Sequence, residues 1–298
     1  MQWMTLLPRD PGYCKGGFAV RLDYHIPSIG LRDCLTVYAD CAEVTVATCE
    51  VLPAMLPNLH IRLAGSSGYQ MAGGASRPAP RVSLIGPTSQ SYRILLEPGL
   101  ELLSAGLLPR GWRDLIGIPS SQLEDQVIDG ELIWGRAAVD RLCDQLQSVE
   151  EINGRLAVLD AFLLQRRRSQ RVERPALEVI DHWLEHDPAL SLDVLSGELG
   201  VGTRQMRRLS LDLHGLSPKT LAMKYRALRA AASMALAGPQ ALALATHAFC
   251  DQAHLTRDFR RFVGWTPMAF ARERQSIAAA TFAGRQRAGA DRCLSLLS

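Results

Sequence analysis

The 298-residue sequence has few aromatic residues and no closely paired cysteines. Aromatic residues make up only 6% of the chain, so a hydrophobic core has to be built from Leu, Ala, Val and Ile. The seven cysteines are scattered without a Cys-x-x-Cys pair, which argues against a disulfide framework or a thiolate zinc site and favours reduced thiols. The net charge of +3 is too small to indicate a partner by itself.

Long hydrophobic runs are missing as well. The longest apolar stretch, residues 230–250, is interrupted by Gly238-Pro239 and contains His247, so it does not fit a membrane span of about 20 residues. The first ten residues lack the basic start, apolar run and cleavage site of a signal peptide. We therefore expect a cytoplasmic protein with no membrane partner, and the length suggests one large or two ordinary domains.

The first 110 residues contain short β-prone runs separated by Gly and Pro, with turns predicted at Gly65–Gly68 and Gly73-Gly74. Several short strands at this spacing favour a sandwich or a barrel. The expected strands are residues 18–26, 35–38, 44–52, 81–85, 92–96 and 100–105.

Residues 111–168 have a helical pattern. Ser148 and Glu151 have the spacing of a capping box and precede an apolar stripe over residues 152–164, which predicts a helix for core packing or for dimerisation. The basic run 165–171 is the candidate linker. In this run Arg166–Arg168 are expected to be a solvated helix end, with phosphate contact as the alternative.

The C-terminal part contains an internal repeat with an offset of 49 residues. Two copies of one supersecondary unit are therefore predicted. The matching pairs are Leu195 with Leu244, Met206 with Leu255, Arg208 with Arg257, Leu213 with Phe262, Gly215 with Gly264, and Ser217-Pro218 with Thr266-Pro267.

Each copy has the pattern of a helix, a tight turn and a second helix. In the first copy Ser191 is the expected cap, and Gly200–Gly202 form the turn. In the second copy the turn is expected around Cys250-Asp251, and Cys250 is assigned to packing rather than to redox sensing. In helix-turn-helix proteins the second helix of such a unit enters the major groove of DNA.

One long helix is predicted between the copies, with Ser217 as its cap and Pro218 at its first position. A helix of this length spans about 30 Å, close to the roughly 34 Å of one DNA turn. Residues 204–272 contain eleven Lys or Arg against three Asp, a net charge of +8. Such a surface suits the DNA polyanion, although an Arg-rich helix face is more often plain solvated surface.

His254 has only Asp258 as a neighbour with metal-binding capacity one turn away, so we interpret it as a DNA contact rather than as a zinc ligand. The repetition of an outward Arg-rich face in both copies favours DNA binding over independent surface decoration.

Residues 175–274 resemble the DNA-binding domain of AraC/XylS-type transcription regulators, and the most diagnostic stretch, residues 245–267, reads ATHAFCDQAHLTRDFRRFVGWTP. The resemblance implies two recognition helices that read adjacent major grooves. The residues it places toward DNA are Arg204, Gln205, Arg207 and Arg208 in the first helix, and Gln252, Ala253, His254 and Arg257 in the second. Three positions depart from the family pattern: Ala248 for Gly, Ser210 for an aromatic residue, and Ser196-Gly197 in a helix that usually has Ala.

The N-terminal region more faintly resembles the cupin-like regulatory domains of the same family, chiefly in residues 99–119. The resemblance implies a small-molecule effector, a homodimer partner, or both, and RNA polymerase as a further partner. The alternative from another class is a metal-dependent cupin-like enzyme fused to a DNA-binding module. His25 and His60 are too far apart in sequence for the His-x-His cluster of that class, so neither an enzyme nor a cofactor is expected.

The expected fold class is α+β. A cupin-like regulatory domain occupies residues 1–168, a seven-helix double helix-turn-helix domain occupies 172–275, and 276–298 form a loose tail. The expected function is that of a transcription factor that binds double-stranded DNA.

Overall fold

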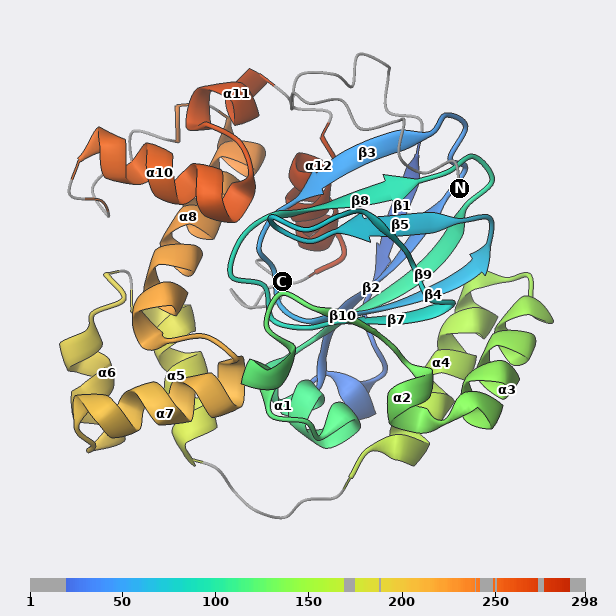
Figure 1. Ribbon diagram of the computed structural model, residues 1–298, viewed down its shortest axis with the longest axis horizontal. Coiled ribbons are helices and arrows are strands. Elements are labelled where there is room, and N and C mark those ends of the chain that lie inside the picture. Colours follow the sequence, from blue (N-terminus) through green and yellow to red (C-terminus); the bar gives the residue numbers. More distant parts are fainter. Residues whose placement is uncertain are drawn as a thin grey trace.

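A computed structural model describes residues 20–168, 175–187, 189–238, 240–241, 249, 251–272 and 276–289. Its N-terminal part contains two antiparallel sheets, and its C-terminal part is helical (Figure 1), which confirms the α+β class. One sheet has six strands in the order β1-β2-β9-β4-β7-β10, and the other has four in the order β3-β8-β5-β6. The strands are β1 (Arg21–His25), β2 (Leu35–Ala42), β3 (Thr48–Leu52), β4 (Asn58–Ala64), β5 (Ser67–Gln70), β6 (Arg77–Pro78), β7 (Val82–Ile85), β8 (Tyr92–Leu96), β9 (Glu101–Leu107) and β10 (Val127–Asp129).

The six-stranded sheet is buried on both faces. Neighbouring side chains of a strand point to opposite sides, so one strand contributes to two different cores. On β9, Leu102 belongs to the core between the two sheets, whereas Leu103 packs under helices on the other face. Those helices are α3 (Arg136–Gln147) and α4 (Ile152–Arg166), which Figure 1 shows against one end of the sheet. The short elements before them are η1 (Ile29–Leu31), α1 (Pro109–Gly111), η2 (Trp112–Ile116), η3 (Ser120–Leu123) and α2 (Glu131–Trp134).

Two expectations for this helical part are wrong. Ser148 and Glu151 do not form a capping box, because α3 continues to Gln147 and the Ser148 hydroxyl donates back to Gln145 O at 2.8 Å. The basic run is also not simply solvated. Arg166 lies over the Phe162 ring at 3.5 Å, and Arg167 pairs with Asp33 at 2.5 Å, so the run packs on its own domain.

The C-terminal helices follow the predicted repeat closely. Ser191 accepts a hydrogen bond from Val194 N, and Ser217 accepts one from Thr220 N at 3.2 Å, so both predicted caps are confirmed. The first helix of the second copy lies outside the described residues, apart from Phe249. The helices are α5 (Pro175–His186), α6 (Leu192–Leu199), α7 (Thr203–His214), α8 (Pro218–Ala237), α10 (Gln252–Val263) and α11 (Pro267–Arg272).

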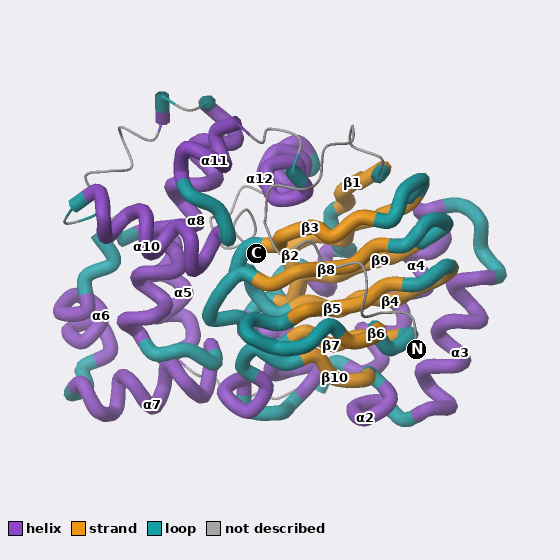
Figure 2. Tube along the Cα trace, turned by 45° about the horizontal axis from the view of Figure 1, so that its top comes forward, coloured by secondary structure: helices purple, strands orange, loops and turns teal. Residues whose placement is uncertain are grey.

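The predicted loose tail is wrong for its first half. Residues 277–287 form a helix, α12 (Ile277–Arg287), which packs against α8, β1 and β3. Ile277 joins the core between the sheets, whereas Phe282 joins the core of the C-terminal helices. Helix α12 therefore lies between the two parts of the molecule (Figure 2). In the part of the chain that the structure describes, no helix is long and apolar enough to cross a membrane.

The two parts of the chain share a buried interface that the sequence did not reveal. The core of the C-terminal helices includes Ala54, Met55 and Leu56 of the β3–β4 loop. Lys224, in the middle of α8, is 2% exposed and donates from Nζ to Met55 O at 2.8 Å and to Thr88 O at 3.0 Å. A lysine that the charge count assigned to the DNA-binding surface is thus an internal link between the domains.

Burial lowers the pKa of Lys224 to about 7, although Asp125 and Glu124 oppose the decrease. Between pH 7 and about 10.5 the unfolded chain keeps a proton that the folded chain has lost, so stability rises with pH across this window. We expect Lys224→Met to flatten this rise, which is at most about 1.4 kcal/mol per pH unit. Urea unfolding of both proteins at pH 7, 8 and 9 measures how the free energy of unfolding changes with pH.

The matched control is Lys219→Met, which removes an exposed lysine from the same helix. This control should leave the pH dependence of the native chain unchanged. Parallel stability curves for the native chain and Lys224→Met would contradict the assignment.

Candidate nucleic-acid interface

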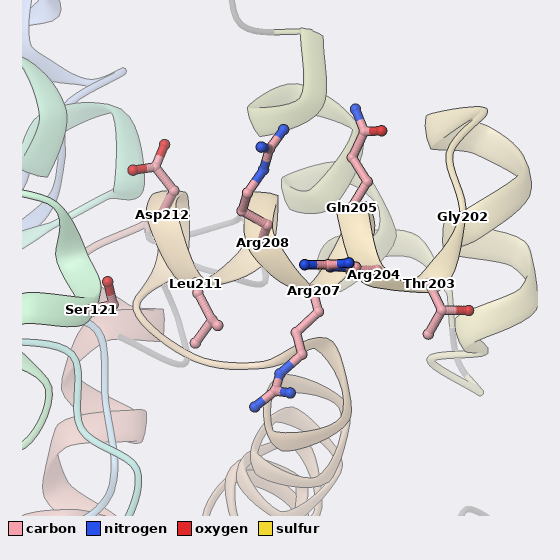
Figure 3. Close-up of a pocket in the computed structure, with 9 residues that line it drawn as sticks. All are labelled: Ser121, Gly202, Thr203, Arg204, Gln205, Arg207, Arg208, Leu211 and Asp212. Carbon is pink, nitrogen blue, oxygen red and sulfur yellow. The ribbon is translucent and has the colours of Figure 1, made fainter.

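The first candidate recognition helix, α7, has one apolar face and one basic face. Met206 and Leu213 are buried in the core of the C-terminal helices. The four residues predicted to contact DNA from this helix are all exposed: Arg204, Gln205, Arg207 and Arg208. In Figure 3, Gln205 and Arg208 leave one edge of the helix, and Arg207 leaves the other.

The basic face of α7 borders an open groove of about 1000 Å³. The groove extends from Gly202 at the start of the helix to Asp212 near its end. Ser121 of the N-terminal domain also lines it (Figure 3), which shows that the two domains meet beside the basic face of α7. The sequence offered no signal for this residue.

The second candidate recognition helix, α10, repeats the arrangement. Leu255, Phe259 and Phe262 are buried on its inner face. Gln252, Ala253 and Arg257 are exposed and line a second open groove, of about 560 Å³. The helix begins with a strong cap, because Asp251 Oδ1 accepts from His254 N at 2.7 Å.

His254 differs from the other predicted contacts because its side chain is only 26% exposed. Its Nε2 lies 3.2 Å from Asp258 Oδ2, and its ring packs edge-on against Phe249 with centroids 5.9 Å apart. Burial raises the pKa of Asp258, and the nearby charge of His254 opposes the increase. The imidazole thus lies along the helix, with Nε2 beside the buried carboxylate of Asp258.

The departures at Ser210 and Ser196 have local explanations. Ser210 is fully buried, and its hydroxyl donates to Leu216 O at 2.6 Å, next to the turn into α8. Ser196 donates to Val201 O at 2.8 Å across the turn between α6 and α7. Both serines therefore satisfy main-chain carbonyls at the turns of the first unit. Ala248 lies outside the described residues.

Of the eleven basic residues counted between 204 and 272, eight are exposed. Lys224 is buried, and Arg229 donates inward to the carbonyls of Leu184 and Asp187. The remaining half-buried residue is Arg226. The surface charge is therefore smaller than the sequence count, but it is concentrated on α7 and α10.

The two recognition helices have the same orientation relative to the sheets. Figure 1 shows that each begins away from the sheets and ends beside them, with α8 between the two units. In helix-turn-helix proteins the N-terminal residues of the recognition helix contact the base edges. The N-terminal ends of α7 and α10 are both on the side of the molecule away from the sheets.

The histidines of the N-terminal domain do not form a metal centre with each other. His60 is buried between the sheets, and its Nδ1 lies 2.8 Å from the Tyr69 hydroxyl. Burial lowers the pKa of His60 to about 4, so it is neutral at physiological pH. Among the described residues, no three His, Cys, Asp or Glu side chains are grouped so that they could hold a metal ion.

Residues 195–273 match a family described as a helix-turn-helix domain. No curated protein matches the chain in sequence. Among solved structures, ToxT from Vibrio cholerae has a TM-score of 0.46 at 11% identity, over 88% of this chain and 100% of ToxT.

Two further solved structures match at low similarity. ToxT from Vibrio cholerae bound to an unsaturated fatty acid has a TM-score of 0.46 at 10% identity, over 85% of this chain and 95% of that chain. The AraC-like transcriptional activator CuxR has a TM-score of 0.31 at 12% identity, over 71% of this chain and 86% of that chain. The family match and the two units together identify residues 195–273 as a helix-turn-helix domain.

Proposed function

We propose that the protein is a sequence-specific transcription factor that reads two adjacent major grooves of double-stranded DNA with α7 and α10. The observation that carries this proposal is the repeated exposed face, which presents Arg204, Arg207 and Arg208 on one unit and Arg257 on the other. Arg is the residue best suited to bidentate contact with guanine. The surrounding basic residues and the helix N-termini supply phosphate contacts.

The length of α8 supports adjacent grooves rather than distant ones. Its 20 residues span about 30 Å, close to one turn of DNA. Because both recognition helices begin on the side of the molecule away from the sheets, one face of a duplex can reach both. Gln205, Gln252, Ala253 and His254 complete the proposed contact set, with His254 limited to the part of its ring that faces away from Asp258.

We propose further that the N-terminal domain controls the reader through a small-molecule effector or through pairing with a second copy, and that RNA polymerase is a downstream partner. The support for control is the shared buried interface, because a change in the sandwich has a direct structural route to α8. We assign no catalytic activity to the chain.

The test is selection of bound duplexes from a random pool by the full-length protein, followed by footprinting. We expect one enriched sequence with two protected segments on one face of the duplex, about 10 base pairs apart. Binding without enrichment, or protection of a single segment, would contradict sequence-specific reading by two units. Increasing the salt concentration should weaken binding steeply, since phosphate contacts release counterions.

A further inference from the structure

The N-terminal domain contacts both helix-turn-helix units through one end of its sandwich. Two loops lie at this end, the β3–β4 loop (residues 53–57) and the β7–β8 loop (residues 86–91). Neither loop belongs to the matched DNA-binding domain. The contacts of these loops bear on where α7 and α10 lie. They do not involve the eight residues predicted to contact DNA.

The C-terminal end of α10 is hydrogen-bonded to both loops. Ser91 N donates to Arg261 O at 2.8 Å, and Arg261 Nε donates back to Ser89 O at 3.2 Å. From the β3–β4 loop, Ala54 N donates to Phe262 O at 2.6 Å. Two of these bonds join main chain to main chain, so they fix the helix end whatever side chains it carries.

The C-terminal end of α7 is held by the same domain. Ser120 Oγ donates to Leu213 O at 3.2 Å. Gly215, directly after the helix, is so close to the β7–β8 loop that an added Cβ would lie 2.5 Å from Pro87 Cγ. The helix end is thus fixed by one hydrogen bond and by close packing.

The duplicated glycines of the repeat mark both docking points. Gly215 and Gly264 have φ angles of +75° and +89°, which is the left-handed conformation of a helix C-cap. An added Cβ on Gly264 would lie 2.3 Å from Val51 and 3.0 Å from Ser91. Equivalent positions of the two units therefore touch the two ends of one loop, at Pro87 and at Ser91.

The middle of α8 is attached at the same place. Lys224 Nζ donates to the carbonyls of Met55 and Thr88, one from each loop. The Thr88 hydroxyl donates to Met55 O at 3.1 Å and so ties the two loops together. All of these groups are buried, where hydrogen bonds are costly to break.

The β7–β8 loop is itself held in place by Asp125. Ser89 donates to the two carboxylate oxygens of Asp125, from N at 2.7 Å and from Oγ at 2.5 Å. Asp125 N donates to Pro87 O at 2.9 Å, and Gly86 N donates to Gln126 O at the same distance. The loop is a fixed part of the N-terminal domain rather than a hinge.

We propose that the β7–β8 loop sets the half-site spacing of the DNA reader, because it holds the ends of α7 and α10 and the middle of α8 on one rigid surface. This proposal rests on the proposed function. On this proposal the N-terminal domain helps to fix the distance between the two half-sites that the protein accepts, in addition to any role in effector binding. Loss of the loop contacts leaves each reading face intact but lets the two units shift relative to each other.

The experiment compares Asp125→Gly with the native full-length chain. Asp125 has a φ of +52°, which glycine adopts without strain, so the variant removes the two bonds to Ser89 and the carboxylate charge near Lys224. The probes are the duplex recovered by selection and derivatives with one base pair inserted or deleted between the two protected segments. Each change moves the half-sites by about 3.4 Å and rotates them by about 35°.

We expect the native chain to lose about tenfold or more in affinity with each change of spacing, since a pre-organised reader cannot follow it. Asp125→Gly should bind the original duplex about five- to tenfold more weakly and should accept the altered spacings within about threefold of it. Asp125→Asn, which keeps an acceptor for Ser89 N and adds a donor for Ser89 Oγ, should restore the native spacing preference.

Asp129→Gly is the matched control for general damage to the domain. Asp129 Oδ1 accepts from Glu131 N at 2.9 Å, so this carboxylate also holds a turn, but one that leads into α2 rather than to the DNA-binding helices. This variant should keep the native spacing profile. If Asp125→Gly does not fold, Ser89→Ala takes its place, because it removes one of the two bonds. Its affinity should also depend less on half-site spacing than that of the native chain, but the effect should be smaller.

A native spacing preference in folded Asp125→Gly, or in Ser89→Ala where it is needed, would overturn the proposal while leaving DNA reading intact. A pool from which the native chain enriches no sequence would instead overturn the proposed function. The two failures are therefore distinguishable.

Discussion

Replacing Arg257 by alanine is expected to weaken binding to the selected duplex by about 1–3 kcal/mol, roughly 5- to 150-fold, and to relax the preference at one base pair. Arg257 is exposed on the outer face of α10 and lines the groove beside Gln252 and Ala253. Because its side chain is on the surface, the stability of the protein should change by no more than about 0.5 kcal/mol. Titration against the selected duplex and its single-base variants measures both effects.

Arg136→Ala controls for the loss of one positive charge. Arg136 is on α3, with a side chain 81% exposed, in the N-terminal domain. This variant should leave affinity and base preference unchanged. If Arg257→Ala weakens binding equally for all sequences, the residue contacts phosphate rather than a base. Unchanged affinity would remove α10 from the reading surface.

Replacing Phe259 by alanine is expected to lower the free energy of unfolding by about 3–5 kcal/mol. Phe259 is fully buried on the inner face of α10 and packs edge-on against Phe270 of α11, with ring centroids 5.6 Å apart. Truncation leaves a cavity where α10, α11 and α8 meet, in a chain with few aromatic residues to fill it. Denaturant unfolding of the full-length chain measures the loss.

Met268→Ala is the matched control on the same small domain. Met268 is a large apolar residue of α11, but it is 61% exposed, so its truncation should cost less than about 0.5 kcal/mol. DNA binding should follow the same order, with strong loss in Phe259→Ala and none in Met268→Ala. A Phe259→Ala protein as stable as the native chain would contradict the place of this ring in the core.

The repeat was the most informative feature of the sequence. It predicted the capped start of α8 at Ser217 and the buried face of α10, because caps and 3.6-residue periodicity depend on local chemistry. The eight predicted DNA contacts stay a prediction: seven of them are exposed, and His254 is half-buried beside Asp258. The spacing of four residues already placed Asp258 one turn away from His254.

Strands with buried polar residues were harder to predict. β4 was missed because His60 and Asn58 interrupt its apolar pattern, yet both are buried, and His60 meets Tyr69 from the opposite sheet. Pairing across sheets depends on tertiary structure, which a local pattern does not contain. The domain interface escaped for the same reason, since main-chain bonds such as Ser91 N to Arg261 O leave no trace in side-chain chemistry.

Because α12 lies between the two parts of the molecule, it limits how the chain can be divided for experiments. Cutting the chain after residue 273, where the family match ends, removes Ala278, Ala279 and Phe282 from the core of the C-terminal helices. A fragment that begins at residue 175 also loses Met55 and Leu56. Such an excised fragment would expose apolar surface that is buried in the intact protein, and it would aggregate. Experiments in solution therefore require the full-length chain.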